Sequence, residues 1–339
     1  MEHQAGDAVV VDLVTGATSA LGRRLVARLV GMGHEVRAIL RVHPSKSNEW
    51  MALPSKVKVY VADLTLKNEN DSKVLEEACA GVDNIFHIAA AVYNYKNTYD
   101  DLININVIGT ENLLNAYEAS NRNSKKPVHI IYASSITVYG YKRPNELLSE
   151  SSATKPSSPY SESKTMAEQV IKSFADANKL MKYTILRFGT FYGPDYKDSY
   201  FKIFKLIEQG RAMYVSGGMN YVELIHEDDA ADSMVLAMAS KSKESEIYNI
   251  TEGGSYTIKW LFEFVAKALG VQSPKRSIPH AIAKITSKIA NINYDELEFL
   301  ASDRKIDISK ARNKLGFEPK HSINKDGLML LEEYKKSKQ

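Results

Sequence analysis

Cysteine and long apolar runs are nearly absent from this sequence. Cys79 is the only cysteine among the 339 residues, which excludes an intrachain disulfide and a metal site built from several cysteines. No stretch approaches the roughly 18 to 20 consecutive apolar residues that a membrane span needs. Residues 1–7 contain two acids and no apolar run, so they do not resemble a signal peptide. We expect a cytoplasmic protein that has no membrane partner.

The sequence also lacks an excess of charge of one sign. Lys and Arg total 44 against 41 Asp and Glu, and the net charge of +3 gives no electrostatic reason to expect a nucleic-acid partner. The run His226-Glu227-Asp228 is interpreted as a strand-to-helix junction whose acids cap the helix, so no metal site is predicted. An apolar fraction of 44% suffices for a sizeable core, which excludes a disordered chain.

Short β-branched runs alternate with amphipathic helical stretches in the first half of the chain. The predicted strands are 9–14, 35–40, 56–61, 84–88, 129–133 and 183–186, and the predicted helices between them are 21–32, 72–80, 99–121 and 160–179. This alternation predicts an α/β fold in which helices cover a doubly wound parallel sheet of the Rossmann type.

The alternation stops after Gly193-Pro194, and helical segments predominate from there on. The predicted helices of this part are 201–209, 258–269 and 281–290. We therefore predict a dinucleotide-binding domain at 1–190 and a smaller, mostly helical substrate lobe at 191–339. Parts of 225–250 are expected to return to the first domain.

A glycine-containing turn joins the first predicted strand to the first predicted helix. Gly16 and Gly22 fill the outer positions of a Gly-x-x-Gly-x-x-Gly spacing, and Ser19 takes the middle position. The N–H groups and the positive dipole end of a helix N-terminus favour a pyrophosphate at such a turn. The pattern predicts a dinucleotide site formed by Gly16, Thr18, Ser19, Ala20, Leu21 and Gly22.

The end of the second predicted strand bears on the choice of cofactor. An acid there would hydrogen-bond the ribose of NAD, whereas a cation accommodates the additional phosphate of NADP. This strand ends in Ile39-Leu40-Arg41, and Ser45 and Lys46 follow closely. We expect Arg41 and Lys46 to bind that phosphate, which favours NADP over NAD; the alternative is that both are exposed loop cations.

A tyrosine and a lysine are placed to act on one substrate. Tyr160 and Lys164 are four positions apart, hence on one face of a helix. A neighbouring ammonium group favours the phenolate and lowers the pKa of a tyrosine from its usual value of about 10. Ser135 ends the fifth predicted strand, at the sheet edge where open α/β sheets bind ligands. These three residues are the catalytic candidates.

Together these segments resemble the extended short-chain dehydrogenase/reductase family, also called the epimerase/dehydratase superfamily. The resemblance covers nearly the whole chain. The matching segments are 15–22, 63–64, 87–91, 106–110, Ser135 with Tyr160 and Lys164, 186–187, 192–194, 225–230 and 307–319.

The resemblance implies roles for individual residues. Tyr160 is the general acid/base, Lys164 tunes it and binds the cofactor's ribose, and Ser135 hydrogen-bonds the reacting oxygen. Asn106 is implied as a helix-kinking or water-positioning residue, and Thr137 as a substrate contact. The further implied cofactor contacts are Asp63 and Leu64 beside the adenine, and Ala89 and Ala90 beside the pyrophosphate. Homodimerisation through the predicted helices 99–121 and 160–179 is also implied.

Departures from the family's patterns separate its branches. Sugar dehydratases carry an acid within two residues after the serine, where this chain has Ile136 and Thr137. Nucleotide-sugar epimerases carry an arginine and an asparagine for the substrate's diphosphate where this chain has Val222 and Thr190. Losing a guanidinium there weakens binding of a doubly charged ligand, although Arg211 or Arg143 could substitute.

The run 36–41, which ends in Arg41, is similar to the dihydroflavonol reductase and hydroxysteroid dehydrogenase branch, which acts on rather apolar carbonyl compounds. We expect Tyr93, Thr190 and Phe191 to contact such a substrate. The predicted function is thus an NAD(P)-dependent oxidoreductase that moves a hydride between nicotinamide and a carbonyl or alcohol carbon. The alternatives are a nucleotide-sugar 4-epimerase with retained NAD and, more remotely, a catalytically inactive cofactor-binding regulator.

Overall fold

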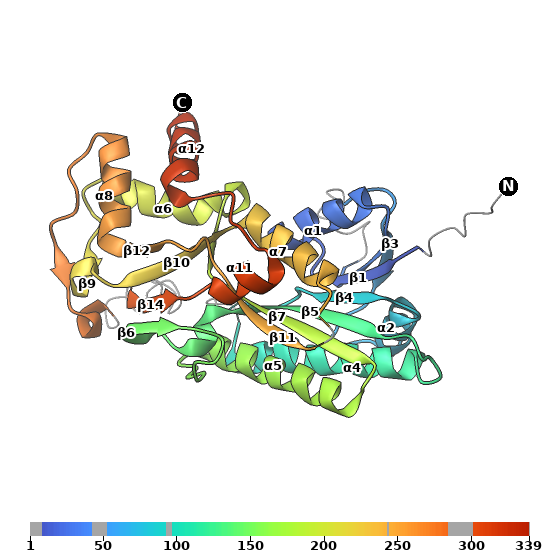
Figure 1. Cartoon of the computed structure of the whole chain (residues 1–339). Helices are drawn as coiled ribbons and strands as arrows, with labels where there is room; N and C mark the ends of the chain where they lie inside the picture. Colours follow the sequence, from blue (N-terminus) through green and yellow to red (C-terminus); the bar gives the residue numbers. More distant parts are fainter. Residues whose placement is uncertain (1–8, 43–52, 93–96, 243, 284–300, 339) are drawn as a thin grey trace.

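One parallel sheet of seven strands crosses the middle of the molecule (Figure 1). The computed structural model describes residues 9–42, 53–92, 97–242, 244–283 and 301–338. In their order across the sheet, the strands are β11 (Glu246–Ile250), β7 (Met181–Phe188), β5 (Val128–Ser135), β4 (Asn84–His87), β1 (Val11–Thr15), β2 (Glu35–Leu40) and β3 (Lys58–Val61). Every pair of neighbours in this sheet is parallel. The predicted α/β fold with a doubly wound parallel sheet is confirmed.

Helices cover both faces of the sheet (Figure 1). One face packs against α2 (Asp71–Cys79), α4 (Gly109–Ser120) and α5 (Pro159–Ala177). The other packs against α1 (Ala20–Gly31), α7 (Glu227–Ala239) and α11 (Ser309–Leu315). Each interface is a separate cluster of buried apolar side chains, so the domain has three layers. Within the described ranges, no helix is both long and apolar enough to cross a membrane.

The predicted helix 99–121 is interrupted in the structure. It consists of α3 (Tyr99–Ile103), one turn of π-helix (Asn104–Ile108) and α4. The six predicted strands are all present with ends shifted by up to two residues, whereas the seventh, β11, was not predicted as a strand. β11 lies within 225–250 and pairs with β7 at the sheet edge.

The second lobe contains more β-structure than the sequence predicts. In the part of this lobe that the structure describes, its helices are α6 (Lys197–Glu208), α8 (Ile258–Leu269) and α12 (Ile323–Lys336). Its small sheets consist of β12 (Ser255–Thr257), β10 (Tyr221–His226) and β8 (Thr190–Tyr192); β13 (Ser277–Ile278) and β9 (Tyr214–Val215); and β14 (Asp303–Ile306) and β6 (Lys142–Leu148). Strands this short carry too few residues for a clear alternation. Most of the predicted helix 281–290 lies outside the described residues.

β6 comes from the first 190 residues but pairs with β14 near the end of the chain. The chain thus crosses between the two parts more than once, and the division at residue 190 remains a prediction.

Strand order locates the crevice in which ligands bind to folds of this kind. β1 pairs with β2 on one side and with β4 on the other, and the chain continues outward from both. The carboxyl ends of β1 and β4 therefore form the switch point of the sheet. The turn after β1 and the residues after β4 meet there.

Candidate active site

The turn between β1 and α1 has room only for glycine at its two outer positions. Gly16 has φ +69°, and a Cβ there would lie 2.7 Å from the backbone nitrogen of Ala89. A Cβ on Gly22 would lie 2.1 Å from the carbonyl oxygen of Gly16. Ser19, at the middle position, is the N-cap of α1, and its side chain accepts a hydrogen bond from the Gly22 N–H at 3.0 Å. The serine is thus compatible with the turn because capping α1 requires a short oxygen-bearing side chain.

The remaining residues of the turn differ in what they can offer a ligand. Ser19 is exposed, Thr18 and Ala20 are half-buried, and Leu21 packs into the core. The carbonyl of Thr18 accepts a hydrogen bond from Arg23 at 2.6 Å. A helix N-terminus with an exposed approach and glycines that allow close packing fits the pyrophosphate of a dinucleotide.

The predicted adenosine contacts lie at the ends of β2 and β3. Arg41 directly follows β2 and is exposed, and Lys46 lies outside the described residues. Asp63 follows β3; burial alone would raise its pKa, but hydrogen bonds from Thr65 and the charges of Lys67 and Arg41 lower it. The carboxylate is therefore ionised at neutral pH.

Leu64 and the two alanines after β4 line the same sheet edge. Leu64 is buried, and a Cβ on Gly109 of α4 would lie 3.2 Å from its side chain. Ala89 is half-buried, and its N–H donates to the hydroxyl of Thr15 at 3.2 Å. Ala90 is exposed. The small side chains leave the backbone accessible beside the turn after β1.

The catalytic candidates lie on β5 and α5, which pack against each other. Ser135 is the last residue of β5 and is half-buried. Its Oγ accepts hydrogen bonds from the N–H and the hydroxyl of Thr137, at 3.2 and 3.0 Å. Because both bonds are received, the Ser135 hydrogen can be donated elsewhere. Thr137, expected to contact substrate, orients Ser135 in this structure.

Tyr160 and Lys164 lie on the first turns of α5. The helix begins with a capping box between Ser158 and Ser161, and Tyr160 is half-buried in its first turn. Lys164 is 2% exposed, and its Nζ donates to the carbonyl of Ala133 in β5 at 2.6 Å. The structure thus holds the lysine against the strand that ends in Ser135.

Burial changes the acidity of Lys164. Desolvation lowers its pKa to about 7, although the charge of Glu168 one turn further along α5 opposes this. The Nζ also lies 4.3 Å from the centre of the Tyr132 ring, over its face. A lysine that titrates near neutrality is characteristic of functional sites.

A buried ion pair that the sequence did not single out fixes α5 on the sheet. Glu168 bonds Arg187 of β7 through both carboxylate oxygens, at 3.0 and 2.7 Å, and accepts from Ser134 at 2.6 Å. Both members of the pair are at most 3% exposed. The sequence contained one indication of this buried acid, because Glu168 stands between the apolar residues Ala167 and Ile171 of the predicted helix.

We expect Arg187→Met to lower the free energy of unfolding by about 3–5 kcal/mol, because it leaves the Glu168 charge buried without its partner. Lys172→Met removes a half-exposed cation 3.5 Å from the same carboxylate, and should cost no more than about 1 kcal/mol. Urea denaturation of the two variants measures the difference. Equal losses of unfolding free energy in the two variants would show that the buried pair stabilises the fold no more than the half-exposed one.

The predicted substrate contacts are only partly described. Thr190 and Phe191 are half-buried on β8, which pairs with β10. The Phe191 ring lies 5.4 Å from that of Phe188 and stacks at 5.4 Å on that of Tyr196. Tyr93 lies outside the described residues. Asn106, implied as a catalytic residue, is buried in the π-helical turn.

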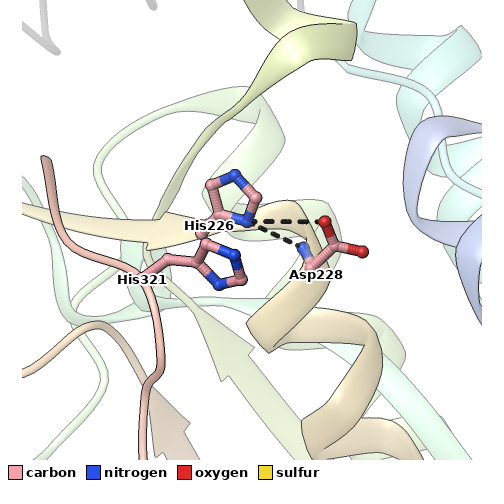
Figure 2. Close-up of side chains that lie close together, drawn as sticks. All are labelled: His226, Asp228 and His321. Atoms are coloured by element: carbon pink, nitrogen blue, oxygen red, sulfur yellow. Dashed lines mark hydrogen bonds and ion pairs between the residues drawn. The ribbon is translucent and has the colours of Figure 1, made fainter. Parts of the chain in front are cut away.

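The junction between β10 and α7 differs from the prediction in one respect. The side chain that caps α7 is that of His226, whose Nδ1 accepts the N–H of Asp228 at 3.2 Å (Figure 2). The acids follow in the first turn, where they favour the positive end of the helix dipole. Prediction of the acids as caps was wrong, because the helix starts one residue after the histidine.

His226, Asp228 and His321 present ligand atoms within 4.8 Å of one another (Figure 2). The two imidazoles stack nearly parallel, with centroids 3.9 Å apart, so that their nitrogen lone pairs do not converge on one point. Asp228 already faces Arg28 at 3.1 Å and Arg24 at 3.4 Å. We therefore interpret the cluster as a structural junction.

Comparison with known proteins identifies the family of the chain. The model of the NAD dependent epimerase/dehydratase family matches residues 13–251. The 4-hydroxy-2-methyl-3-oxo-4-farnesyl-3,4-dihydroquinoline-1-oxide ketoreductase of Stigmatella aurantiaca is 26% identical, over 81% of this chain and 78% of that protein. The decarboxylating sterol-4-alpha-carboxylate 3-dehydrogenase of Dictyostelium discoideum is 23% identical, over 92% and 97%. The structure of UDP-glucuronic acid 4-epimerase from Bacillus cereus in complex with NAD superposes with a TM-score of 0.74 at 21% identity, covering 97% and 100%.

The family model begins inside β1 and ends at the residue after β11, so it includes all seven strands of the sheet except the first two residues of β1. The two relatives named here are a reductase and a dehydrogenase, whereas the structural neighbour is an epimerase. The comparisons therefore do not select one reaction. The family inferred from the motifs is confirmed. The chain belongs to the NAD-dependent epimerase/dehydratase family.

Proposed function

We propose that the protein is an NAD(P)-dependent oxidoreductase that interconverts a small-molecule carbonyl compound and its alcohol. The observation that carries the proposal is the meeting of Ser135, at the end of β5, with the helix that bears Tyr160 and the buried Lys164. Tyrosine, lysine and serine together provide a proton, its electrostatic control and a donor to an oxyanion.

In reduction, Tyr160 donates its hydroxyl proton to the carbonyl oxygen, and Ser135 donates a hydrogen bond to the same oxygen as negative charge develops there. Thr137 keeps the Ser135 hydrogen directed outward because it occupies Oγ as a donor. The ammonium form of Lys164 favours the phenolate that Tyr160 leaves behind. The turn at Gly16 and Gly22 would hold a nicotinamide cofactor, which would supply the hydride. Oxidation of the alcohol runs these steps in reverse.

Two positions support a carbonyl substrate over a nucleotide sugar. Val222 is 3% exposed within the lobe core, so this position offers no cation for a diphosphate. Arg143, one of the two arginines that could substitute, bonds Glu146 and the carbonyls of Tyr139 and Ala153. Of these two arginines, Arg211 remains to bind the diphosphate in the epimerase alternative, and its side chain is exposed.

We propose NADP as the preferred cofactor, because the exposed Arg41 at the end of β2 offers a guanidinium where NAD-specific folds place an acid. NADPH should bind the purified protein more tightly than NADH. Arg41→Ser should weaken NADPH binding about tenfold and leave NADH binding nearly unchanged, since only the 2′-phosphate loses a partner. Fluorescence titration with both nucleotides measures the two dissociation constants.

Lys58→Ser is the matched control, because Lys58 is an exposed cation at the opposite end of the neighbouring strand β3. It should change neither dissociation constant. NAD that stays with the protein through gel filtration would instead favour the epimerase, which regenerates its own cofactor in each cycle. If no carbonyl compound supports NADPH or NADH oxidation while a nucleotide sugar is epimerised, the proposed oxidoreductase is wrong.

A further inference from the structure

His87 ends β4 at the switch point of the sheet and is fully buried between two threonines. Its Nδ1 lies 2.8 Å from Oγ1 of Thr15, the last residue of β1, and its Nε2 lies 2.8 Å from Oγ1 of Thr110 on α4. Burial, and after it the charge of Lys164, lowers the pKa of His87 to about 3. The imidazole is therefore neutral, so that one ring nitrogen donates and the other accepts.

The helix side of the ring fixes which nitrogen carries the hydrogen. Thr110 Oγ1 lies 2.6 Å from the carbonyl oxygen of Asn106, in the π-helical turn. A carbonyl oxygen can only accept, so the Thr110 hydroxyl donates to it. Thr110 must then accept from His87, which places the imidazole hydrogen on Nε2.

The strand side agrees with this tautomer. Thr15 Oγ1 accepts the N–H groups of Ile88 and Ala89, each at 3.2 Å. The hydrogen of the Thr15 hydroxyl is therefore left for His87 Nδ1, which is the unprotonated nitrogen. The two N–H groups belong to the backbone that packs against Gly16, so Thr15 connects the imidazole to the turn expected to hold the pyrophosphate.

The network continues from Asn106 to the catalytic helix. The Asn106 side chain pairs with both backbone groups of Ala91, at 2.7 and 3.0 Å, and donates to Oγ of Ser163 at 2.9 Å. Ser163 in turn donates to the carbonyl oxygen of Tyr160 at 2.8 Å. Thr15, His87, Asn106, Thr110 and Ser163 are all at most 1% exposed, so water does not compete for these bonds.

We propose that His87 is a positioning residue, whose Nε2–H tautomer joins the turn after β1 to the helix that carries Tyr160 through two buried runs of hydrogen bonds that meet at Asn106. The first run donates from the N–H groups of Ile88 and Ala89 to the backbone carbonyl of Asn106, and the second donates from the Asn106 side-chain amide to the carbonyl of Tyr160. The first run cannot be reversed, because its first members can only donate and its last can only accept. Dinucleotide binding at the turn and alignment of Tyr160 are thereby coupled. The inference rests on the proposed function for the role of Tyr160.

Two substitutions of His87 separate its hydrogen bond to Thr15 from its hydrogen bond to Thr110. In His87→Asn, the amide oxygen reaches the place of Nδ1 and accepts from Thr15, while Thr110 loses its donor. In His87→Gln, the longer side chain brings its amide nitrogen to the place of Nε2 and donates to Thr110, while Thr15 loses its acceptor. Each variant therefore keeps one half of the chain of hydrogen bonds.

We expect His87→Gln to weaken NADPH binding about tenfold, with a smaller loss of turnover at saturating cofactor. His87→Asn should show the opposite division, with a loss of turnover about tenfold and a smaller change in the dissociation constant. If either variant fails to fold, Thr15→Val and Thr110→Val open the same two links without changing the imidazole. The positioning role is overturned if both variants lose affinity and turnover in the same proportion.

His129→Gln and His129→Asn are the matched controls. His129 is also buried and also bonds a threonine, Thr184 at 2.8 Å, but it lies near the amino end of β5, at the opposite edge of the sheet. These variants should change stability while both affinity and turnover stay as in the unmodified protein. If they reproduce the effects of the His87 variants, those effects are losses of general stability, and the proposal is wrong.

A readout that needs no turnover separates this inference from the proposed reaction. The ring carbon resonance of Tyr160, assigned by its loss in Tyr160→Phe, should shift when NADPH is added to protein labelled at tyrosine. His87→Asn should reduce that shift and His87→Gln should retain it at saturating NADPH. A shift that is the same in both variants overturns the coupling. If the unmodified protein binds neither NADPH nor NADH, the proposed function has failed before the coupling is addressed.

Discussion

Tyr160→Phe is expected to lower turnover by about a hundredfold to ten thousandfold while the dissociation constant for the cofactor stays within about twofold. A phenylalanine ring fills the same half-buried place in the first turn of α5 but has no proton to donate. The capping box at Ser158 and Ser161, which starts the helix, is left intact. The loss is therefore chemical and not a consequence of misfolding. Steady-state rates and a fluorescence titration measure the two quantities.

Tyr183→Phe is the control for this variant. Tyr183 is also half-buried, but it lies near the amino end of β7, away from the carboxyl edge of the sheet. Its loss of a hydroxyl should leave turnover unchanged. If Tyr160→Phe keeps more than about a tenth of the activity, Tyr160 is not the proton donor, and the assignment of the catalytic set is wrong.

Local patterns in the sequence were sufficient for six of the seven strands of the sheet and for the turn after β1. The strand Glu35–Leu40 was predicted with the observed ends, since its last three residues are apolar and the charged Arg41 follows them directly. Gly16 and Gly22 were predicted from their spacing and from their place directly after the first predicted strand, and the contacts of their missing Cβ atoms explain the requirement. The role of Ser19 as the cap of α1 was not predicted.

Features that depend on long-range contacts were not predictable. Five residues at 246–250 have no diagnostic alternation, and only their pairing with β7 identifies them as a strand. The π-helical turn shifts the helical register by one residue, which a periodicity over 23 positions does not resolve. His87 stood within a recognised motif, but its protonated nitrogen is set by threonines 72 and 23 residues away. The Glu168–Arg187 pair likewise joins a helix to a strand further along the chain.

Lys164→Met is expected to stabilise the cofactor-free protein by roughly 1–3 kcal/mol at pH 6 while abolishing most of its turnover. Lys164 is 2% exposed and has its pKa lowered to about 7, mainly by desolvation. A methionine of similar shape avoids the cost of burying the ammonium but cannot tune Tyr160. Lys179→Met, which replaces an exposed lysine just beyond the same helix, should change the free energy of unfolding by no more than a few tenths of a kcal/mol.

The advantage of the Lys164→Met variant should depend on pH in a defined direction. Between pH 7 and 10.5 the unfolded chain still holds the Lys164 proton, whereas the folded protein has largely released it. The stability of the lysine form therefore rises with pH across this window, and the variant's advantage shrinks. Urea denaturation of both proteins at about pH 6, 7.5 and 9 measures the difference between their free energies of unfolding at each pH. The contributions of the other titrating groups cancel in this difference. A stability gain from Lys164→Met that is absent at pH 6, or that grows toward pH 9, would mean that the folded protein keeps Lys164 charged at little cost. The proposed control of Tyr160 by Lys164 would then involve no cost of desolvating the ammonium group.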